Sequence, residues 1–120
     1  MYYEGRCAVV GGFERVGKSE ARLLEEAFKR AEEVSVYVVP DLDERQLKRA
    51  LRKLEQYLRA RYPGRYEVRV MKSLEEAAES DAHTLVVPYS ELAEKLNALR
   101  EKRGLKRLTT VVVEPESGGD

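Results

Sequence analysis

The chain has 120 residues, 42% of them hydrophobic and 37% charged, a length that suits one domain with a single core. Basic and acidic side chains number 22 each, so the net charge is zero and no global basic field attracts nucleic acid. Cys7 is the only cysteine, which excludes an internal disulfide and a cysteine-based zinc site.

No segment has the composition of a signal peptide or a membrane-spanning helix, because no run approaches about 18 apolar residues. We therefore expect a cytoplasmic protein with no membrane partner. Charged side chains are abundant and amides are few, a balance typical of heat-adapted proteins with many surface ion pairs. Residues 1–115 are expected to form one domain, and residues 116–120 a frayed tail.

The first part of the chain predicts a strand, a helix and a second strand. Residues 6–10 are apolar and precede Gly11-Gly12, which predicts a buried strand followed by a turn. From about Lys18, apolar residues recur at spacings of three and four and predict an amphipathic helix. Residues 34–39 are largely β-branched and stop at a proline, which predicts the second strand.

The middle of the chain continues the alternation. Asp43 can cap a second helix whose leucine stripe ends at Pro63-Gly64. Residues 66–71 alternate between polar and apolar and predict a third strand near an edge of the sheet. Residues 73–76, Ser-Leu-Glu-Glu, match a capping box that opens a short helix, and residues 84–88 predict the fourth strand.

The last part of the chain predicts a further helix and strand. Leucines at positions 92, 96 and 99 form the apolar stripe of that helix, and Gly104 follows as its C-cap. Residues 108–113 predict the fifth strand. Strict alternation of apolar strands with helices predicts a doubly wound α/β fold, with a five-stranded parallel sheet covered by helices on both faces. Ligands of such sheets bind at the carboxyl ends of the strands.

The loop after the first strand matches the P-loop pattern GxxxxGKS over residues 12–19, in the required strand–helix context. In this interpretation backbone N–H groups hold phosphates, Lys18 meets their charge, and Ser19 binds Mg²⁺ together with Asp41. It implies a small NTP-binding protein with ATP and Mg²⁺ as ligands. The alternative is that glycine, lysine and serine are common at any strand-to-helix turn of a doubly wound protein.

The C-terminal third carries a second signal, the run K-L-N-A-L-R-E-K-R-G-L at residues 95–105 before a valine-rich strand. It resembles the K-I-N-x-I-R-x-x-R-G-L segment of archaeal phosphopantetheine adenylyltransferases, which are nucleotidyltransferases of the HxGH class. The resemblance extends over nearly the whole chain. It implies a Rossmann-like nucleotidyltransferase fold with the first strand central, and a phosphate contact at Arg100. The alternative for Arg100 is a solvated basic helix face.

The catalytic loop of that family, G-G-T-F-D-x-x-H-x-G-H, is where this chain departs most. Gly17 and Glu20 stand where the two histidines belong. Those histidines stabilise the α-phosphate as its charge builds, and a glutamate opposes the same chemistry. The I-S-S-T-x-I segment that closes over the nucleotide phosphates in the family is also missing from these 120 residues. The resemblance therefore implies a pseudoenzyme with lost or altered adenylyl transfer.

Two roles stay open beside the P-loop interpretation, and neither includes a catalytic or metal-binding residue. The first is nucleotide or phosphate binding at a residual anion site. That site would consist of Gly11, Gly12, Gly17, Lys18, Ser19 and Arg100. The second is a non-catalytic scaffold repurposed to bind a protein or a nucleic acid. If Phe13 or Arg15 instead fills the loop, we expect a chain that has abandoned nucleotides.

Overall fold

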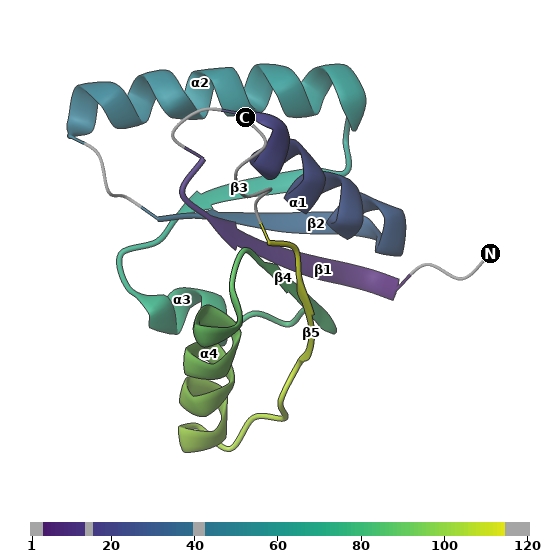
Figure 1. Ribbon diagram of the computed structural model, residues 1–120, viewed down its shortest axis with the longest axis vertical. Helices are drawn as coiled ribbons and strands as arrows, with labels where there is room; N and C mark the ends of the chain where they lie inside the picture. Colours follow the sequence, from purple (N-terminus) through teal and green to yellow (C-terminus); the bar gives the residue numbers. More distant parts are fainter. Residues whose placement is uncertain (1–3, 14–15, 40–42, 115–120) are drawn as a thin grey trace.

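The computed structural model describes residues 4–13, 16–39 and 43–114 of the chain. Strands and helices alternate along these residues. They are β1 (Glu4–Gly11), α1 (Lys18–Arg30), β2 (Ala31–Val38), α2 (Glu44–Arg61), β3 (Tyr66–Val70), α3 (Leu74–Ala78), β4 (Thr84–Val87), α4 (Ser90–Lys102) and β5 (Thr109–Val112). All strand pairs are parallel, in the order β3-β2-β1-β4-β5 (Figure 1). The five-stranded parallel sheet with the first strand at its centre is confirmed.

Helices cover both faces of the sheet (Figure 1). The face under α1 and α2 is one buried cluster that includes Cys7 and Val9 of β1. The face under α3 and α4 is a second cluster that includes Ala8 and Val10. Because side chains alternate along a strand, β1 supplies both clusters, which explains why its sequence is an uninterrupted apolar run.

The second strand begins three residues earlier than predicted, because α1 passes into β2 without a loop. The side chain of Arg65, which precedes β3, supplies hydrogen bonds to carbonyl groups at this junction. Its guanidinium donates hydrogen bonds to the carbonyls of Phe28, Ala31 and Glu32 at 2.8–3.0 Å. The ring of Phe28 stacks on Tyr62 with centroids 3.8 Å apart, which fixes the end of α1 against the end of α2.

Two of the predicted helix caps form and one does not. Asp43 caps α2 by accepting a hydrogen bond of 2.8 Å from the N–H of Gln46, and Gly104 follows α4 with a positive φ of 74°. The predicted capping box at 73–76 is wrong, because the Ser73 side chain makes no cap bond. A bond from its own backbone N–H and one from the Ser73 hydroxyl lower the pKa of the Glu75 carboxyl. The Ser73 hydroxyl is therefore drawn to Glu75 and away from the helix start.

Candidate functional site

The glycine loop follows β1 at the carboxyl edge of the sheet. The N–H of Val39 donates a hydrogen bond of 3.0 Å to the carbonyl of Gly11, so the ladder to β2 continues up to the loop. Gly12 is exposed, with nothing within 4 Å of a Cβ built on it. Phe13 then adopts a left-handed conformation with a φ of 43°. Such a conformation costs a residue with a side chain about 1–2 kcal/mol, so the surrounding fold must favour it.

The favourable interaction is the burial of the Phe13 ring in the core. Phe13 is 2% exposed and belongs to the cluster under α1 and α2. A Cβ built on Gly11 would lie 3.1 Å from Cε2 of Phe13 and 3.6 Å from Cδ1 of Leu23. Gly11 therefore makes room for an aromatic ring of the chain itself. The Phe13 side chain is therefore part of the core beneath the loop.

The start of α1 is capped by a carboxylate of the same helix. Oε1 of Glu20 accepts a hydrogen bond of 2.9 Å from the N–H of Gly17. A carboxylate in the first turn also interacts favourably with the positive end of the helix dipole. Lys18 is exposed and Ser19 is half-buried in the same turn. A phosphate approaching Lys18 and Ser19 would therefore meet the negative carboxylate of Glu20, which already accepts the hydrogen bond of the Gly17 N–H.

Arg100 is not part of this loop, which corrects its predicted grouping with the glycines, Lys18 and Ser19. It lies at the end of α4, and only 7% of it is exposed. Its Nε donates to the carbonyl of Lys106 at 2.6 Å, and its Nη1 donates to the carbonyls of Ala78 and Ser80 at 2.8 Å. These carbonyls precede β4 and β5, at the amino edge of the sheet. Neither a phosphate contact nor a solvated helix face describes a buried guanidinium that holds loops together.

The other residues of the C-terminal resemblance have mixed surroundings. Asn97 is 2% exposed and bonds both backbone groups of Leu108, accepting from its N–H at 2.8 Å and donating to its carbonyl at 3.3 Å. Arg103 forms an ion pair with Glu79. Lys95 is exposed and borders an apolar groove between α3 and α4. Within the K-L-N-A-L-R run, the side chains of Asn97 and Arg100 therefore have a structural role, because both form hydrogen bonds with backbone groups.

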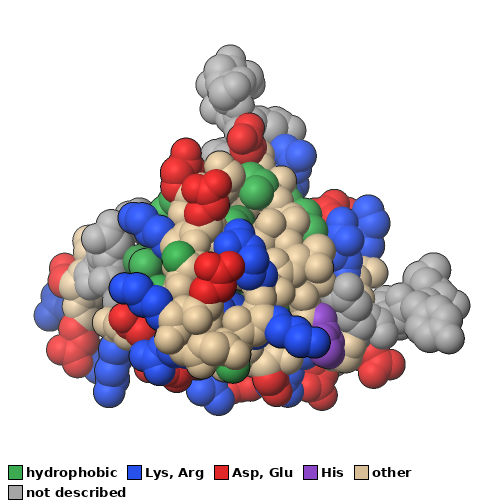
Figure 2. Space-filling view, turned by 90° about the horizontal axis from the view of Figure 1, so that it is seen from below, with side chains coloured by type: hydrophobic (Ala, Val, Ile, Leu, Met, Phe, Trp, Pro, Cys, Tyr) green, Lys and Arg blue, Asp and Glu red, His purple; other side chains and the backbone are tan. Residues whose placement is uncertain are grey.

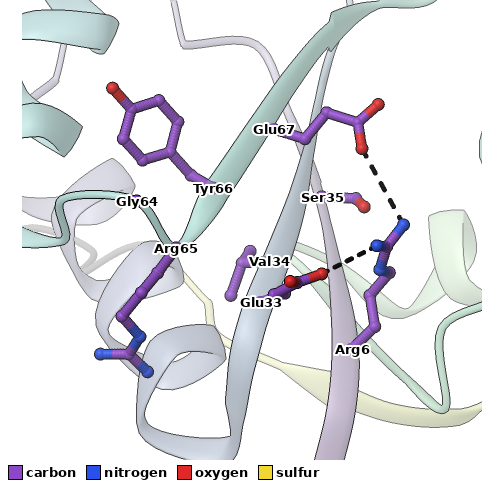
Figure 3. Close-up of a pocket in the computed structure, with 8 residues that line it drawn as sticks. All are labelled: Arg6, Glu33, Val34, Ser35, Gly64, Arg65, Tyr66 and Glu67. Atoms are coloured by element: carbon purple, nitrogen blue, oxygen red, sulfur yellow. Dashed lines mark hydrogen bonds and ion pairs between the residues drawn. The ribbon is translucent and has the colours of Figure 1, made fainter.

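A hollow that the sequence did not predict lies at the amino edge, between the starts of β1, β2 and β3 (Figure 3). Its volume is about 150 Å³. Figure 3 shows Arg6 of β1 pointing toward one carboxylate from β2 and one from β3, with its guanidinium 2.8 Å from Glu33 and 3.9 Å from Glu67. Asp81 lies 3.5 Å from the same guanidinium. The hydrogen bond to Glu33 and the charge of Asp81 raise the pKa of Arg6.

The chemistry of this hollow is that of an ion-pair network. Arg6 and Glu33 are Cα partners in the β1–β2 ladder, so strand register brings them together. Three carboxylates around one guanidinium leave little positive charge for a further anion. The sequence signal for this network was a charged residue directly before each of two apolar runs, Arg6 before residues 7–10 and Glu33 before Val34. It matches the surface ion pairs expected from the composition.

No metal site forms among the described residues, where no group of three or more His, Cys, Asp and Glu side chains is suited to a metal ion. Asp41, the predicted second Mg²⁺ ligand, lies outside the described residues. Within the described ranges, no helix combines the length and apolar character needed to cross a bilayer. Figure 2 shows positive and negative side chains interspersed over one face of the molecule, without the one-sign stripe typical of nucleic-acid binding.

Comparison with known proteins gives structural likeness only. No protein-family model and no curated protein matches the sequence. The fold is similar to that of a protein with unknown function from Archaeoglobus fulgidus, with a TM-score of 0.75 and 22% identity, covering 91% of this chain and 98% of that chain. It is also similar to the lipopolysaccharide core biosynthesis protein from Thermoplasma volcanium GSS1, with a TM-score of 0.65 and 14% identity, covering 94% of this chain and 99% of that chain. At these identities the likeness establishes an α/β fold.

Proposed function

We propose that this protein is a non-catalytic scaffold of nucleotidyltransferase-like fold, in which the glycine loop no longer serves a nucleotide. The burial of the Phe13 ring against Gly11 is the observation that carries the proposal. Glu20, bonded to the Gly17 N–H at the start of α1, supports it. The resemblance to phosphopantetheine adenylyltransferases supplies the ancestry. In this account the fold is retained as a binding module, with a macromolecule as its partner.

Two free-energy terms oppose a nucleotide at the loop. A nucleotide that displaced the ring of Phe13 from the core would expose a buried aromatic side chain, which costs about 1.5–3 kcal/mol, or roughly 10–100-fold in affinity. The carboxylate of Glu20 would have to release the Gly17 amide and then stand beside the incoming phosphates. Both terms weaken the binding of ATP, CTP and coenzyme A alike, because each acts at the backbone that would hold their phosphates.

A second candidate function is residual phosphate or nucleotide binding at the start of α1. It is favoured by one observation: Lys18 is exposed and Gly12 has open space above it, at the positive end of a helix of 13 residues. The P-loop interpretation uses the same residues and adds Mg²⁺ and hydrolysis. The two candidates differ from the scaffold in one respect, since each requires Lys18 to contact a ligand.

The test of the proposal is an activity assay with purified protein, ATP, Mg²⁺ and phosphopantetheine. We expect no synthesis of dephospho-coenzyme A above the enzyme-free rate. The positions that match the family's histidines hold Gly17 and Glu20, and loss of one preorganised donor typically costs about 10²–10³ in rate. ATP and GTP hydrolysis is expected to be absent as well.

Two results would contradict the proposal. Pyrophosphate release that depends on phosphopantetheine would show that adenylyl transfer survives. Mg²⁺-dependent hydrolysis abolished by Lys18→Ala, but not by Lys29→Ala at the exposed end of the same helix, would instead support a P-loop enzyme. The lysine pair is a matched control, because both side chains are exposed on α1 and only Lys18 adjoins the loop.

A further inference from the structure

The two edges of the sheet differ in how they are protected. β3 forms one edge and carries Glu67 and Arg69, which pair with each other. Charged side chains on an edge strand discourage pairing with another chain. β5 forms the other edge, reads Thr-Thr-Val-Val, and holds no charged residue. Val112 is a large hydrophobic side chain that is 37% exposed there. The β5 edge therefore lacks the charged side chains that protect β3.

Main-chain groups on the outer side of β5 pair with no strand among the residues that the structure describes. The N–H of Val113 donates to the carbonyl of Val87 on β4 at 2.9 Å. Because the main-chain groups of successive residues point to opposite sides of a strand, Thr110 and Val112 direct theirs to the outer side. Within the described residues, β4 is the strand that pairs with β5. Asn97 already satisfies both groups of Leu108, so the open stretch begins after it.

The charges that flank β5 favour an antiparallel copy of the same strand. Lys106 and Arg107 precede the strand, where Arg107 already pairs with Glu101 of α4, and Glu114 follows the strand. In an antiparallel pair the basic start of one copy lies beside the acidic end of the other. Lys106 and Glu114 are an even number of positions apart, so their side chains point to the same face of the sheet. Lys106 of one copy and Glu114 of the other are then diagonal neighbours, within reach of a long side chain. A parallel partner strand of this sequence would place like charges together.

We propose that a second copy of this chain pairs along β5, antiparallel, with the twofold axis at Val111. In this register Thr110 of each copy exchanges N–H···O bonds with Val112 of the other, and the two Val111 side chains meet on the side of α1. Val111 is partly buried against the α1 cluster, so its contact with the second copy extends an existing apolar face. The two sheets become one continuous sheet. The inference is independent of the proposed function, because β4 separates β5 from β1 and from the glycine loop that follows β1.

Sedimentation equilibrium over about 1–100 µM protein tests the pairing. We expect a monomer–dimer equilibrium with a dissociation constant in the micromolar range, as suits a modest interface. Val112→Lys should raise that constant about tenfold or more, because a lysine on the edge opposes pairing. Tyr89→Lys is the matched control, since Tyr89 is 51% exposed and lies in the turn between β4 and α4, outside the β5 strand. Circular dichroism verifies that each variant is folded.

Cysteine variants test the register independently of affinity. Val111→Cys should form an intermolecular disulfide under mild oxidation, because an opposed, non-hydrogen-bonded pair has Cα atoms about 4.5 Å apart, inside the disulfide range. Thr110→Cys should not, because its opposed residue is Val112. Cys7 is 0% exposed and does not compete. A wild-type protein that stays monomeric at about 100 µM overturns the proposal. So does a dimer unchanged by Val112→Lys, or cross-linking at position 110 in preference to 111.

Discussion

Replacement of Arg100 by alanine is expected to lower the free energy of unfolding by about 3–5 kcal/mol. The guanidinium is 7% exposed and donates to the carbonyls of Ala78, Ser80 and Lys106. Without it, these acceptors lose a charged donor in a place where water enters poorly. The loops before β4 and β5 would then separate from the end of α4. Urea unfolding at equilibrium measures the change, and the melting temperature should fall by about 10 °C or more.

Two variants separate this structural role from a loss of charge. Arg103→Ala removes an exposed arginine at the C-cap of α4 that pairs with Glu79, and should change stability by about 1 kcal/mol at most. Arg100→Lys keeps the charge but lacks the planar guanidinium, and its stability should lie between those of Arg100→Ala and Arg103→Ala. If Arg100→Ala is as stable as Arg103→Ala, the side chain does not hold the amino-edge loops, and a role in ligand binding regains support.

Replacement of Phe13 by alanine should lower stability by a similar amount, about 3–5 kcal/mol, because it removes a fully buried aromatic ring. Phe13→Gly adds a sharper test. Phe13 has a φ of 43°, which glycine adopts without strain, so Phe13→Gly should be about 1–2 kcal/mol less destabilising than expected from its lost side chain alone. Urea unfolding of both variants gives the comparison.

Tyr89→Ala is the control for Phe13→Ala, because Tyr89 is an aromatic residue with 51% exposure. Its removal should change stability by about 0.5 kcal/mol or less. Equal effects of Phe13→Ala and Tyr89→Ala would mean that the Phe13 ring contributes nothing to the core. The glycine loop would then be open in solution, and the proposed loss of nucleotide binding would lose its structural basis.

Periodicity in the sequence predicted the sheet, because apolar strands and amphipathic helices are encoded locally. Gly104 and Asp43 were recognisable for the same reason, since a helix cap depends on residues within one turn. The role of Arg100 depends on three carbonyls that lie 6–22 positions away along the chain. No local pattern distinguishes such an arginine from a solvated one. The family resemblance therefore indicated a phosphate contact that the fold does not form.

Two residues of the glycine loop and the helix start, Phe13 and Glu20, indicate in the sequence how this segment folds. Glu20 stands three residues after Gly17, the spacing at which a helix-start glutamate bonds the cap residue's N–H. Phe13 is a large apolar residue in a turn, and such residues are usually buried. The P-loop pattern specifies only the glycines, Lys18 and Ser19, so it takes no account of Phe13 or Glu20. What fills the loop is decided by the positions that the pattern leaves open.

The central claim, that the chain closes its own phosphate-binding loop, is tested most directly by calorimetric titration with ATP, in the presence and absence of Mg²⁺. The account predicts no saturable binding by the wild-type protein up to about 1 mM ATP. A micromolar dissociation constant that Lys18→Ala abolishes and Lys29→Ala leaves unchanged would contradict it.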